Sequence, residues 1–278
     1  MDHVLILGAK GMLGGALQKI FPGATAWDRE DCDVTDFANL PQKIGSLQNL
    51  AAVINCVAYN DVDGAETHHD LAFQLNSEVP VNLAKICRQF NIPLVHFTSQ
   101  LVFDGAKGEY MEADLPNPIS VYGESKYSGE QEIQKATDKF YIIRTSVLFG
   151  LKGQSELSKK SFVDLMLDLS QRSATIKAVE DEQSSITFVN DLAENVKEIL
   201  ENRPAYGIYH ITNSGSATWY DFAKEIFSIT GSQVNLIPVP STEFPRTAKR
   251  PAKAVLLNTK LSALRPWQAA LQEFLTTK

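Results

Sequence analysis

The chain of 278 residues has the composition of a water-soluble globular protein, with 44% hydrophobic residues and a formal net charge of -7. An acidic balance without a cluster of lysines and arginines argues against binding to nucleic acid. No apolar run approaches the length of a membrane span, so we expect neither a nucleic-acid nor a membrane partner.

The cysteines and the N-terminal segment predict a cytoplasmic protein. Cys32, Cys56 and Cys87 are odd in number and widely spaced, as expected for free thiols in a reducing compartment. The apolar run in "MDHVLILGAKG" is too short for a signal peptide and leads directly into a glycine-rich loop. His68 and His69 are adjacent rather than one helical turn apart, so we expect no metal site there.

Short apolar runs of β character alternate with helical segments in the first half of the chain. The expected strands are "HVLILG", "ATAWD", "AAVINCVA", "PLVHFTS" and "FYIIRTS", and the expected helices cover 12–21, 71–90 and 120–136. Continuous apolar strands separated by helices are typical of a parallel sheet covered on both faces. The sequence therefore predicts an α/β fold with a doubly wound parallel sheet in residues 1–150.

The alternation is less regular after residue 150. We expect strands at "ATIKAV", "GIYHITN" and "VNLIPVP" and helices over 191–201 and 218–229. We assign residues 151–278 mainly to a smaller substrate-binding region, with some segments returning to the first domain.

The first strand-to-helix junction carries glycines at a spacing suited to a dinucleotide. In "LILGAKGMLGGAL", Gly8, Gly11 and Gly14 lie between the expected strand and helix. Glycines there allow the backbone to approach a pyrophosphate, whose charge is stabilised by the N-terminus of the helix. Because a strand precedes the loop and a helix follows it, we favour a bound dinucleotide over a simple tight turn.

The end of the second expected strand leaves the type of dinucleotide open. Asp28 follows Gly8 by about 20 residues, the usual distance for a carboxylate that binds the adenosine ribose hydroxyls of NADH. Lys10 and Arg29 could instead bind the 2′-phosphate of NADPH, and each of these charges could also be a solvated surface group.

Two Tyr/Lys pairs have a spacing of four residues, which places both side chains of a pair on one face of a helix. They are Tyr122 with Lys126 in "VYGESKYSGE" and Tyr220 with Lys224 in "WYDFAKE". An ammonium group beside a phenol stabilises the phenolate and lowers the pKa of the tyrosine. The spacing alone is equally compatible with a surface lysine that packs over a ring.

The surrounding sequence favours chemistry at the first pair. Ligands of doubly wound sheets bind at the carboxyl ends of the strands, and "PLVHFTSQ" ends in polar residues shortly before the Tyr122 helix. The second pair follows the end of the regular alternation, within the apolar segment "WYDFAKEIF". We therefore expect Tyr220 and its neighbour Trp219 on the packed face of a helix.

These motifs together resemble a known family. The glycine-rich loop, "NCVAYNDVDGAE", "QLNSEVPVNLAKIC", "VFDG", "VYGESKYSGE" and "IIRTS" are similar to the extended short-chain dehydrogenases/reductases, and more narrowly to the dTDP-4-dehydrorhamnose reductase family. The resemblance continues through "GIYHITNSGSATWYDFAKEIF", "FPRTAKRP" and "AVLLNTKL" and covers nearly the whole chain. It implies a Rossmann fold and NADPH- or NADH-dependent reduction of a 4-keto-6-deoxy nucleotide sugar.

The resemblance implies Ser99, Tyr122 and Lys126 as the catalytic residues. Ser99 would hydrogen-bond the substrate carbonyl, Tyr122 would donate a proton, and Lys126 would lower the pKa of Tyr122 and bind the nicotinamide ribose. No metal is needed for this step. We expect cofactor contacts from Gly8, Lys10, Gly11, Met12, Leu13, Gly14, Asp28, Arg29, Asp33, Val34, Cys56, Val57, Ala58, Tyr59, Tyr122 and Lys126.

The expected substrate contacts are Ser99, Gln100, Val147 and Arg250, and two of them depart from the family pattern. Gln100 stands where the family usually has Asp, and Val147 stands where it usually has Trp. An amide donates as well as accepts hydrogen bonds, and loss of an indole removes a stacking surface. We expect a wider and less acidic sugar pocket, with neutral drift as the alternative.

Two other functions remain open. An epimerase or dehydratase would need a further acid-base group near Ser99, which Gln100 cannot supply. A non-enzymatic dinucleotide-binding regulatory subunit would keep the fold, but the intact set of Ser, Tyr and Lys weighs against it. The sequence does not settle metal dependence, product stereochemistry or oligomeric state, for which a homodimer is the candidate.

Overall fold

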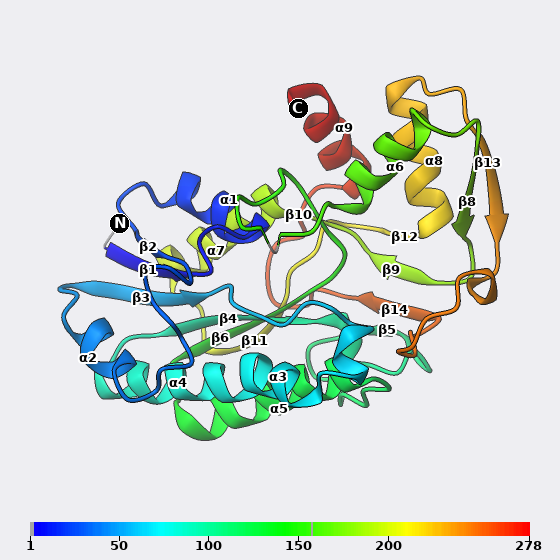
Figure 1. Cartoon of the computed structure of the whole chain (residues 1–278). Helices are drawn as coiled ribbons and strands as arrows, with labels where there is room; N and C mark the ends of the chain where they lie inside the picture. Colours follow the sequence, from blue (N-terminus) through cyan, green and yellow to red (C-terminus); the bar gives the residue numbers. More distant parts are fainter. Residues whose placement is uncertain (1–2, 157) are drawn as a thin grey trace.

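A six-stranded parallel sheet forms the centre of the computed structural model, which describes residues 3–156 and 158–278 (Figure 1). The strand order is β11-β6-β4-β3-β1-β2. The strands are β1 His3–Leu7, β2 Thr25–Trp27, β3 Leu50–Asn55, β4 Leu94–Ser99, β6 Phe140–Thr145 and β11 Gly207–His210. The direction of winding reverses between β1 and β3, so the predicted doubly wound α/β fold is confirmed.

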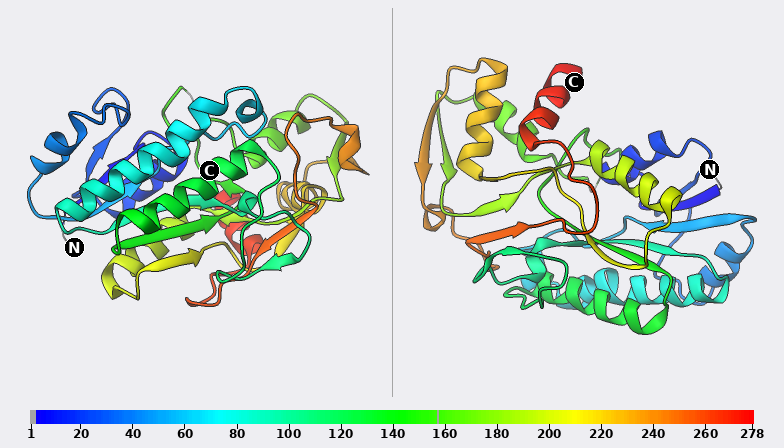
Figure 2. Two further views of the ribbon diagram at one scale, coloured as in Figure 1. Left: turned by 90° about the horizontal axis from the view of Figure 1, so that it is seen from below. Right: turned by 180° about the vertical axis from the view of Figure 1, so that it is seen from behind.

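Helices cover both faces of this sheet (Figures 1 and 2). Side chains alternate between the faces of a strand, and β1 shows this directly. Val4 and Ile6 belong to the core under α1 (Met12–Ile20) and α7 (Val189–Asn202). Leu5 and Leu7 belong to the core on the other face, under α2 (Leu40–Gly45), α4 (Val79–Gln89) and α5 (Val121–Ala136).

The helix expected over residues 71–90 contains a π-helical turn. It consists of α3 (His69–Phe73), the π-turn Gln74–Glu78 and α4. Pro80 favours this π-turn, because it has no amide hydrogen with which to form the i→i−4 hydrogen bond of a regular α-helix. The buried Asn76 side chain accepts a hydrogen bond from the Tyr59 amide at 2.9 Å and donates one to Ser125 Oγ at 3.0 Å. The π-turn thus anchors the loop after β3 to α5.

Further sheets and helices of the C-terminal half lie beside the main sheet. A four-stranded sheet has the order β12 Ser216–Thr218, β9 Gln183–Ser185, β14 Lys253–Leu256 and β5 Gly108–Tyr110. Two-stranded sheets pair β7 Leu148–Phe149 with β10 Thr187–Phe188, and β8 Thr175–Val179 with β13 Asn235–Val239. Helices α6 Phe162–Ser170, α8 Trp219–Thr230 and α9 Trp267–Thr277 pack around an aromatic core, and short 3-10 turns occupy Gly64–Glu66, Gln100–Val102 and Ser241–Glu243.

The two halves of the chain are interwoven. β5 comes from the first half and pairs with β14, whereas α7 and β11 come from the second half and complete the main sheet layer. Within the described residues, none of the helices is both long and apolar enough to cross a lipid bilayer.

Gly14 packs closely against the glycine-rich loop, whereas its neighbour Gly15 does not. We therefore predict that alanine at these two positions has opposite effects on stability. A Cβ atom at Gly14 would lie 2.2 Å from the carbonyl oxygen of Gly8, whereas one at Gly15 meets nothing within 4 Å. We expect Gly14→Ala to lower the free energy of unfolding by about 1–3 kcal/mol. Gly15→Ala should raise it by about 0.5–1 kcal/mol, because alanine is the better helix former. Urea unfolding of both variants measures this contrast, and equal stabilities would contradict it.

Candidate active site

A cavity of about 500 Å³ opens at the carboxyl ends of β1, β3, β4 and β6. This is the position at which doubly wound sheets bind their ligands. The expected residues that line it are Gly11, Met12, Leu13, Gly14, Cys56, Val57, Ala58, Ser99, Gln100, Tyr122, Lys126, Val147 and Arg250. The cavity therefore joins the glycine-rich loop, the end of β4 and the C-terminal half.

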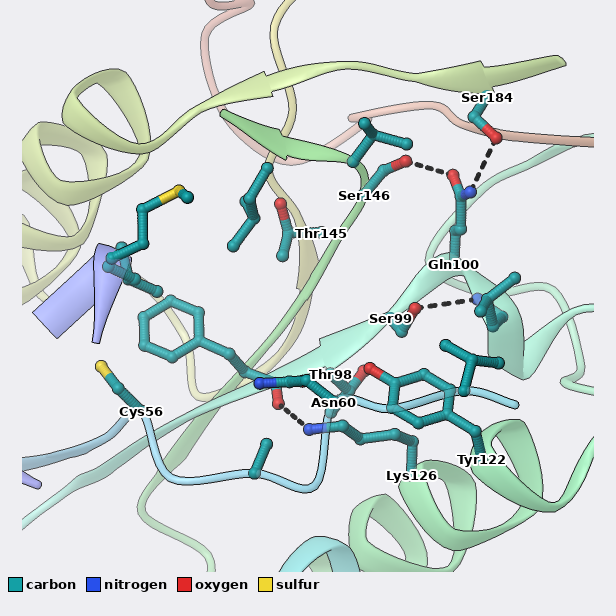
Figure 3. A pocket seen from close by; sticks show the side chains of 18 of the residues that line it. Cys56, Asn60, Thr98, Ser99, Gln100, Tyr122, Lys126, Thr145, Ser146 and Ser184 are labelled. Carbon is teal, nitrogen blue, oxygen red and sulfur yellow. Dashed lines mark hydrogen bonds between the residues drawn. The ribbon is translucent and has the colours of Figure 1, made fainter. Parts of the chain in front are cut away.

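Tyr122 and Lys126 project from the first two turns of α5 toward the end of β4, where Ser99 lies (Figure 3). The helix begins at Ser120, whose hydroxyl accepts a hydrogen bond from the Gly123 amide at 3.2 Å. A Cβ atom at Gly123 would lie 2.2 Å from the carbonyl oxygen of Leu101. Glycine at this position therefore lets the start of α5 pack against the turn after β4.

Hydrogen bonds to the β4 segment hold the two polar groups beside the tyrosine. Lys126 Nζ donates to the carbonyl oxygen of Phe97 at 3.2 Å. Ser99 Oγ accepts from the amide of Leu101 at 3.1 Å, so its own proton is free to be donated elsewhere.

Burial governs the protonation of both titratable groups. It raises the pKa of Tyr122 to about 12, against the opposing effects of the Ser99 hydroxyl and the Arg250 charge. This direction is opposite to the lowering expected from the sequence, because desolvation of the phenolate outweighs the Ser99 hydrogen bond and the Arg250 charge. Burial also lowers the pKa of Lys126 to about 8, although Glu130 opposes the shift. At neutral pH the pair is a neutral phenol and a largely protonated amine.

The glycine-rich loop forms a backbone cradle at the N-terminus of α1. Gly8 has φ of +76° and packs so closely that a Cβ atom would lie 3.1 Å from the backbone of Cys56 and Val57. Gly11 precedes the helix and lines the cavity. Backbone amides at a helix N-terminus suit the diphosphate of a dinucleotide, so the residues present fit this cofactor.

The expected contacts at the adenosine end lie outside the cavity lining. Asp28 accepts hydrogen bonds from the amides of Lys10 at 2.7 Å and Arg29 at 2.9 Å, so it braces the glycine-rich loop. Lys10 Nζ pairs with Glu30 at 3.0 Å. The expected contacts that do not line the cavity are Gly8, Lys10, Asp28, Arg29, Asp33, Val34 and Tyr59.

Gln100 is fixed within the cavity wall by two serines (Figure 3). Its amide nitrogen donates to Ser184 Oγ at 2.8 Å, and its amide oxygen accepts from the hydroxyl of Ser146. The side chain is only 6% exposed. It therefore links the end of β4 to β9, which no local sequence pattern indicates.

Trp219 and Arg246 line the cavity but were missed by the sequence reasoning. Trp219 Nε1 donates to Glu182 at 3.3 Å, and the same carboxylate pairs with Arg246 at 2.7 Å. Trp219 packs against Phe162 with ring centroids 4.8 Å apart, as expected, but because it begins α8 it also lines the cavity, which was not expected. Its position at the start of the expected helix was the sequence feature that could have indicated its place in the cavity wall.

The second Tyr/Lys pair lies elsewhere. Tyr220 packs against the aromatic core of the C-terminal half, and Lys224 is exposed. His68 Nδ1 lies 3.0 Å from the carbonyl oxygen of Gly64, and His69 stacks on Phe73. Over residues 3–156 and 158–278, no group of three or more His, Cys, Asp or Glu side chains is arranged to hold a metal ion.

Comparison with known proteins finds close relatives over the whole chain. The family model of the RmlD substrate binding domain matches residues 1–278. A probable dTDP-4,6-dihydroxy-2-methyloxan-3-one 4-ketoreductase of Streptomyces antibioticus is 35% identical over 97% of this chain and 93% of the relative. A dTDP-4-dehydrorhamnose reductase of Streptomyces griseus is 34% identical over 97% of this chain and 91% of the relative.

A solved structure agrees with these relatives. The crystal structure of dTDP-4-dehydrorhamnose reductase from Bacillus anthracis in complex with NADP is 32% identical in sequence and superimposes with a TM-score of 0.94. The match covers 100% of this chain and 99% of that chain.

The backbone cradle predicts that a side chain at Gly11 blocks dinucleotide binding. A Cβ atom there would lie 3.2 Å from the carbonyl oxygen of Gly8 and extend a branched side chain into the cavity. We expect Gly11→Val to weaken NADPH and NADH binding by about tenfold or more, measured by calorimetry. Gly15→Val is the matched control, because Gly15 lies on the same helix with open space around it. Equal affinities of the two variants would refute the placement.

Proposed function

Because the chain belongs to the RmlD substrate binding domain family, we propose that it reduces the 4-keto group of a dTDP-linked 4-keto-6-deoxy sugar with NADPH or NADH. The observation that carries the proposal is the convergence of Ser99, Tyr122 and Lys126 on a cavity that begins at the glycine-rich loop. The names of the two relatives and the NADP in the related crystal structure support the same reaction class.

Different groups of the chain would bind the cofactor and act on the substrate. A bound nicotinamide dinucleotide supplies the hydride. The amides of Met12 and Leu13 would hold its diphosphate at the N-terminus of α1, and Lys126 would bind the nicotinamide ribose.

Ser99 and Tyr122 act on the keto oxygen. The Ser99 hydroxyl donates a hydrogen bond to this oxygen, while its own oxygen still accepts from the Leu101 amide. Tyr122 donates its proton as negative charge develops there, and the high pKa ensures that the phenol carries this proton at neutral pH. The Lys126 ammonium stabilises the phenolate that remains until solvent returns a proton. General acid catalysis of this kind contributes about 10²- to 10⁴-fold to the rate.

Two arginines suit the nucleotide diphosphate of the substrate. Arg250 pairs with Asp63 at 2.8 Å, and Arg246 pairs with Glu182 at 2.7 Å, so both guanidinium groups are held at the cavity wall. Guanidinium groups bind phosphate oxygens through two parallel hydrogen bonds. We also place the reaction in the cytoplasm, in keeping with the free thiols of Cys32, Cys56 and Cys87.

Turnover by the Tyr122 variant tests the function. Wild type should oxidise NADPH or NADH when given dTDP-4-keto-6-deoxy sugars, followed by the loss of absorbance of the reduced cofactor. Tyr122→Phe should lower kcat by at least about a hundredfold with cofactor affinity unchanged, because only the proton donor is removed. Tyr220→Phe, the control in the second pair, should keep its rate. Absence of turnover in wild type, or equal rates of wild type and Tyr122→Phe, would overturn the proposal.

The substrate preference depends on the Gln100 bridge. Gln100→Asp removes the donor to Ser184 and adds a charge, so it should change the ratio of kcat/KM between dTDP-4-keto-L-rhamnose and another 4-keto nucleotide sugar by about tenfold or more. Ser184→Ala removes the same hydrogen bond without adding charge, and separates the two effects. A competition assay measures the ratio. An unmoved ratio in both variants would mean that Gln100 does not determine specificity.

A further inference from the structure

A buried ion pair lies next to the catalytic residues, and the proposed reaction does not use it. Glu130 follows Lys126 by one helical turn on α5, as Lys126 follows Tyr122, so the three side chains share one face of the helix. The side chain of Glu130 is 0% exposed, and that of its partner Arg144 is 2% exposed.

The ion pair connects three elements of the fold. Arg144, on β6, donates from Nη2 to Glu130 Oε2 at 2.6 Å and from Nε to Oε1 at 3.0 Å. The hydroxyl of Thr98, on β4, donates to the same carboxylate. Burying an ion pair costs desolvation energy and seldom adds stability over an apolar pair. Its position one turn from Lys126 suggests a role in the site.

The pair determines the balance of charge around Lys126. Lys126 and Arg144 are two cations in the interior. Glu130 forms an ion pair with Arg144, and its charge raises the pKa of Lys126. If Glu130 were neutral, two buried positive charges would lack compensation, and such like charges favour loss of a proton from the lysine.

Four of the other titratable groups around this cluster are neutral at pH 7. Burial and the Lys126 charge hold the pKa of His96 well below its usual range, and burial with the Arg144 charge lowers that of His210 to about 4. Burial raises the pKa of Cys56 and of Tyr122. The fifth group, the carboxylate of Glu112, is charged and accepts a hydrogen bond from the backbone amide of His210. Among these groups, Glu130 is the counter-charge nearest to Lys126.

We propose that Glu130 is a positioning residue whose buried charge, besides neutralising Arg144, keeps Lys126 protonated and bound to the carbonyl oxygen of Phe97. Its kinetic consequence rests on the proposed reductase function, whereas the charge state of Lys126 is a property of the folded protein alone.

The isosteric variant Glu130→Gln tests this role. Titration of the lysine side-chain nitrogens by ¹⁵N NMR, with the Lys126 signal identified by its loss in Lys126→Arg, reports the protonation directly. The pKa of Lys126, about 8 in wild type, should fall by about one unit or more in Glu130→Gln. Glu132→Gln is the matched control, because Glu132 lies on the same helix but pairs at the surface with Lys135 at 2.7 Å. It should leave the titration unchanged.

The double variant Glu130→Gln/Arg144→Gln separates charge from structure. It removes both charges of the pair, so the pKa of Lys126 should fall by less than in Glu130→Gln but stay below the wild-type value, because the charge of Glu130 itself raises it. If Glu130→Gln does not fold, this remaining fall decides the matter. A Lys126 titration that is unmoved in either variant would overturn the proposal.

Kinetics provide the second measurement. The rate should fall as pH rises through the pKa of Lys126, and this fall should begin about one pH unit lower in Glu130→Gln. An identical pH profile in wild type and Glu130→Gln would overturn the inference. If wild type reduces no keto sugar, the proposed function fails, while the NMR titration still decides the role of Glu130.

Discussion

The close packing of α5 against the end of β4 is the constraint on which the rest of the site depends. Three successive turns of the helix bring Tyr122, Lys126 and Glu130 to the last residues of this strand. The absence of a side chain at Gly123 permits the approach, and Ser120 fixes where the helix starts. Proton donor, ammonium group and counter-charge thus have fixed relative positions because they share one rigid element.

Local patterns were sufficient to predict the main fold and much of the cavity. The continuous apolar strands could only be buried in a sheet covered on both faces, and the glycine spacing at the end of β1 has few other physical explanations. Ser99 at the end of β4 was predicted for the same reason, since the carboxyl ends of parallel strands meet at one edge, whereas Val147 after β6 was predicted only from the family resemblance. These features depend on interactions within short segments of the chain.

The features that sequence reasoning missed depend on contacts between distant segments. The link between Gln100 and Ser184 and the pair of Arg250 with Asp63 join residues far apart in the sequence. The high pKa of Tyr122 follows from burial by several elements, which no spacing reveals. Asp28 lies after the second strand as expected, but its carboxylate already accepts hydrogen bonds from the amides of Lys10 in the glycine-rich loop and of the adjacent Arg29.

The interwoven four-stranded sheet has a consequence for folding during synthesis. β14 lies between β5 and β9. β5 is made early in synthesis, but it can pair only after β14, near the end of the chain, has been made. Contacts between such distant segments close slowly, because the entropy of the intervening loop must be lost first. The glycine-rich loop and its helix can form while the chain is still emerging from the ribosome, whereas the opposite wall of the cavity must await nearly the whole chain. A nascent chain would therefore pair the strands beside the glycine-rich loop before it could close the opposite wall of the cavity, although α1 packs on α7 only later.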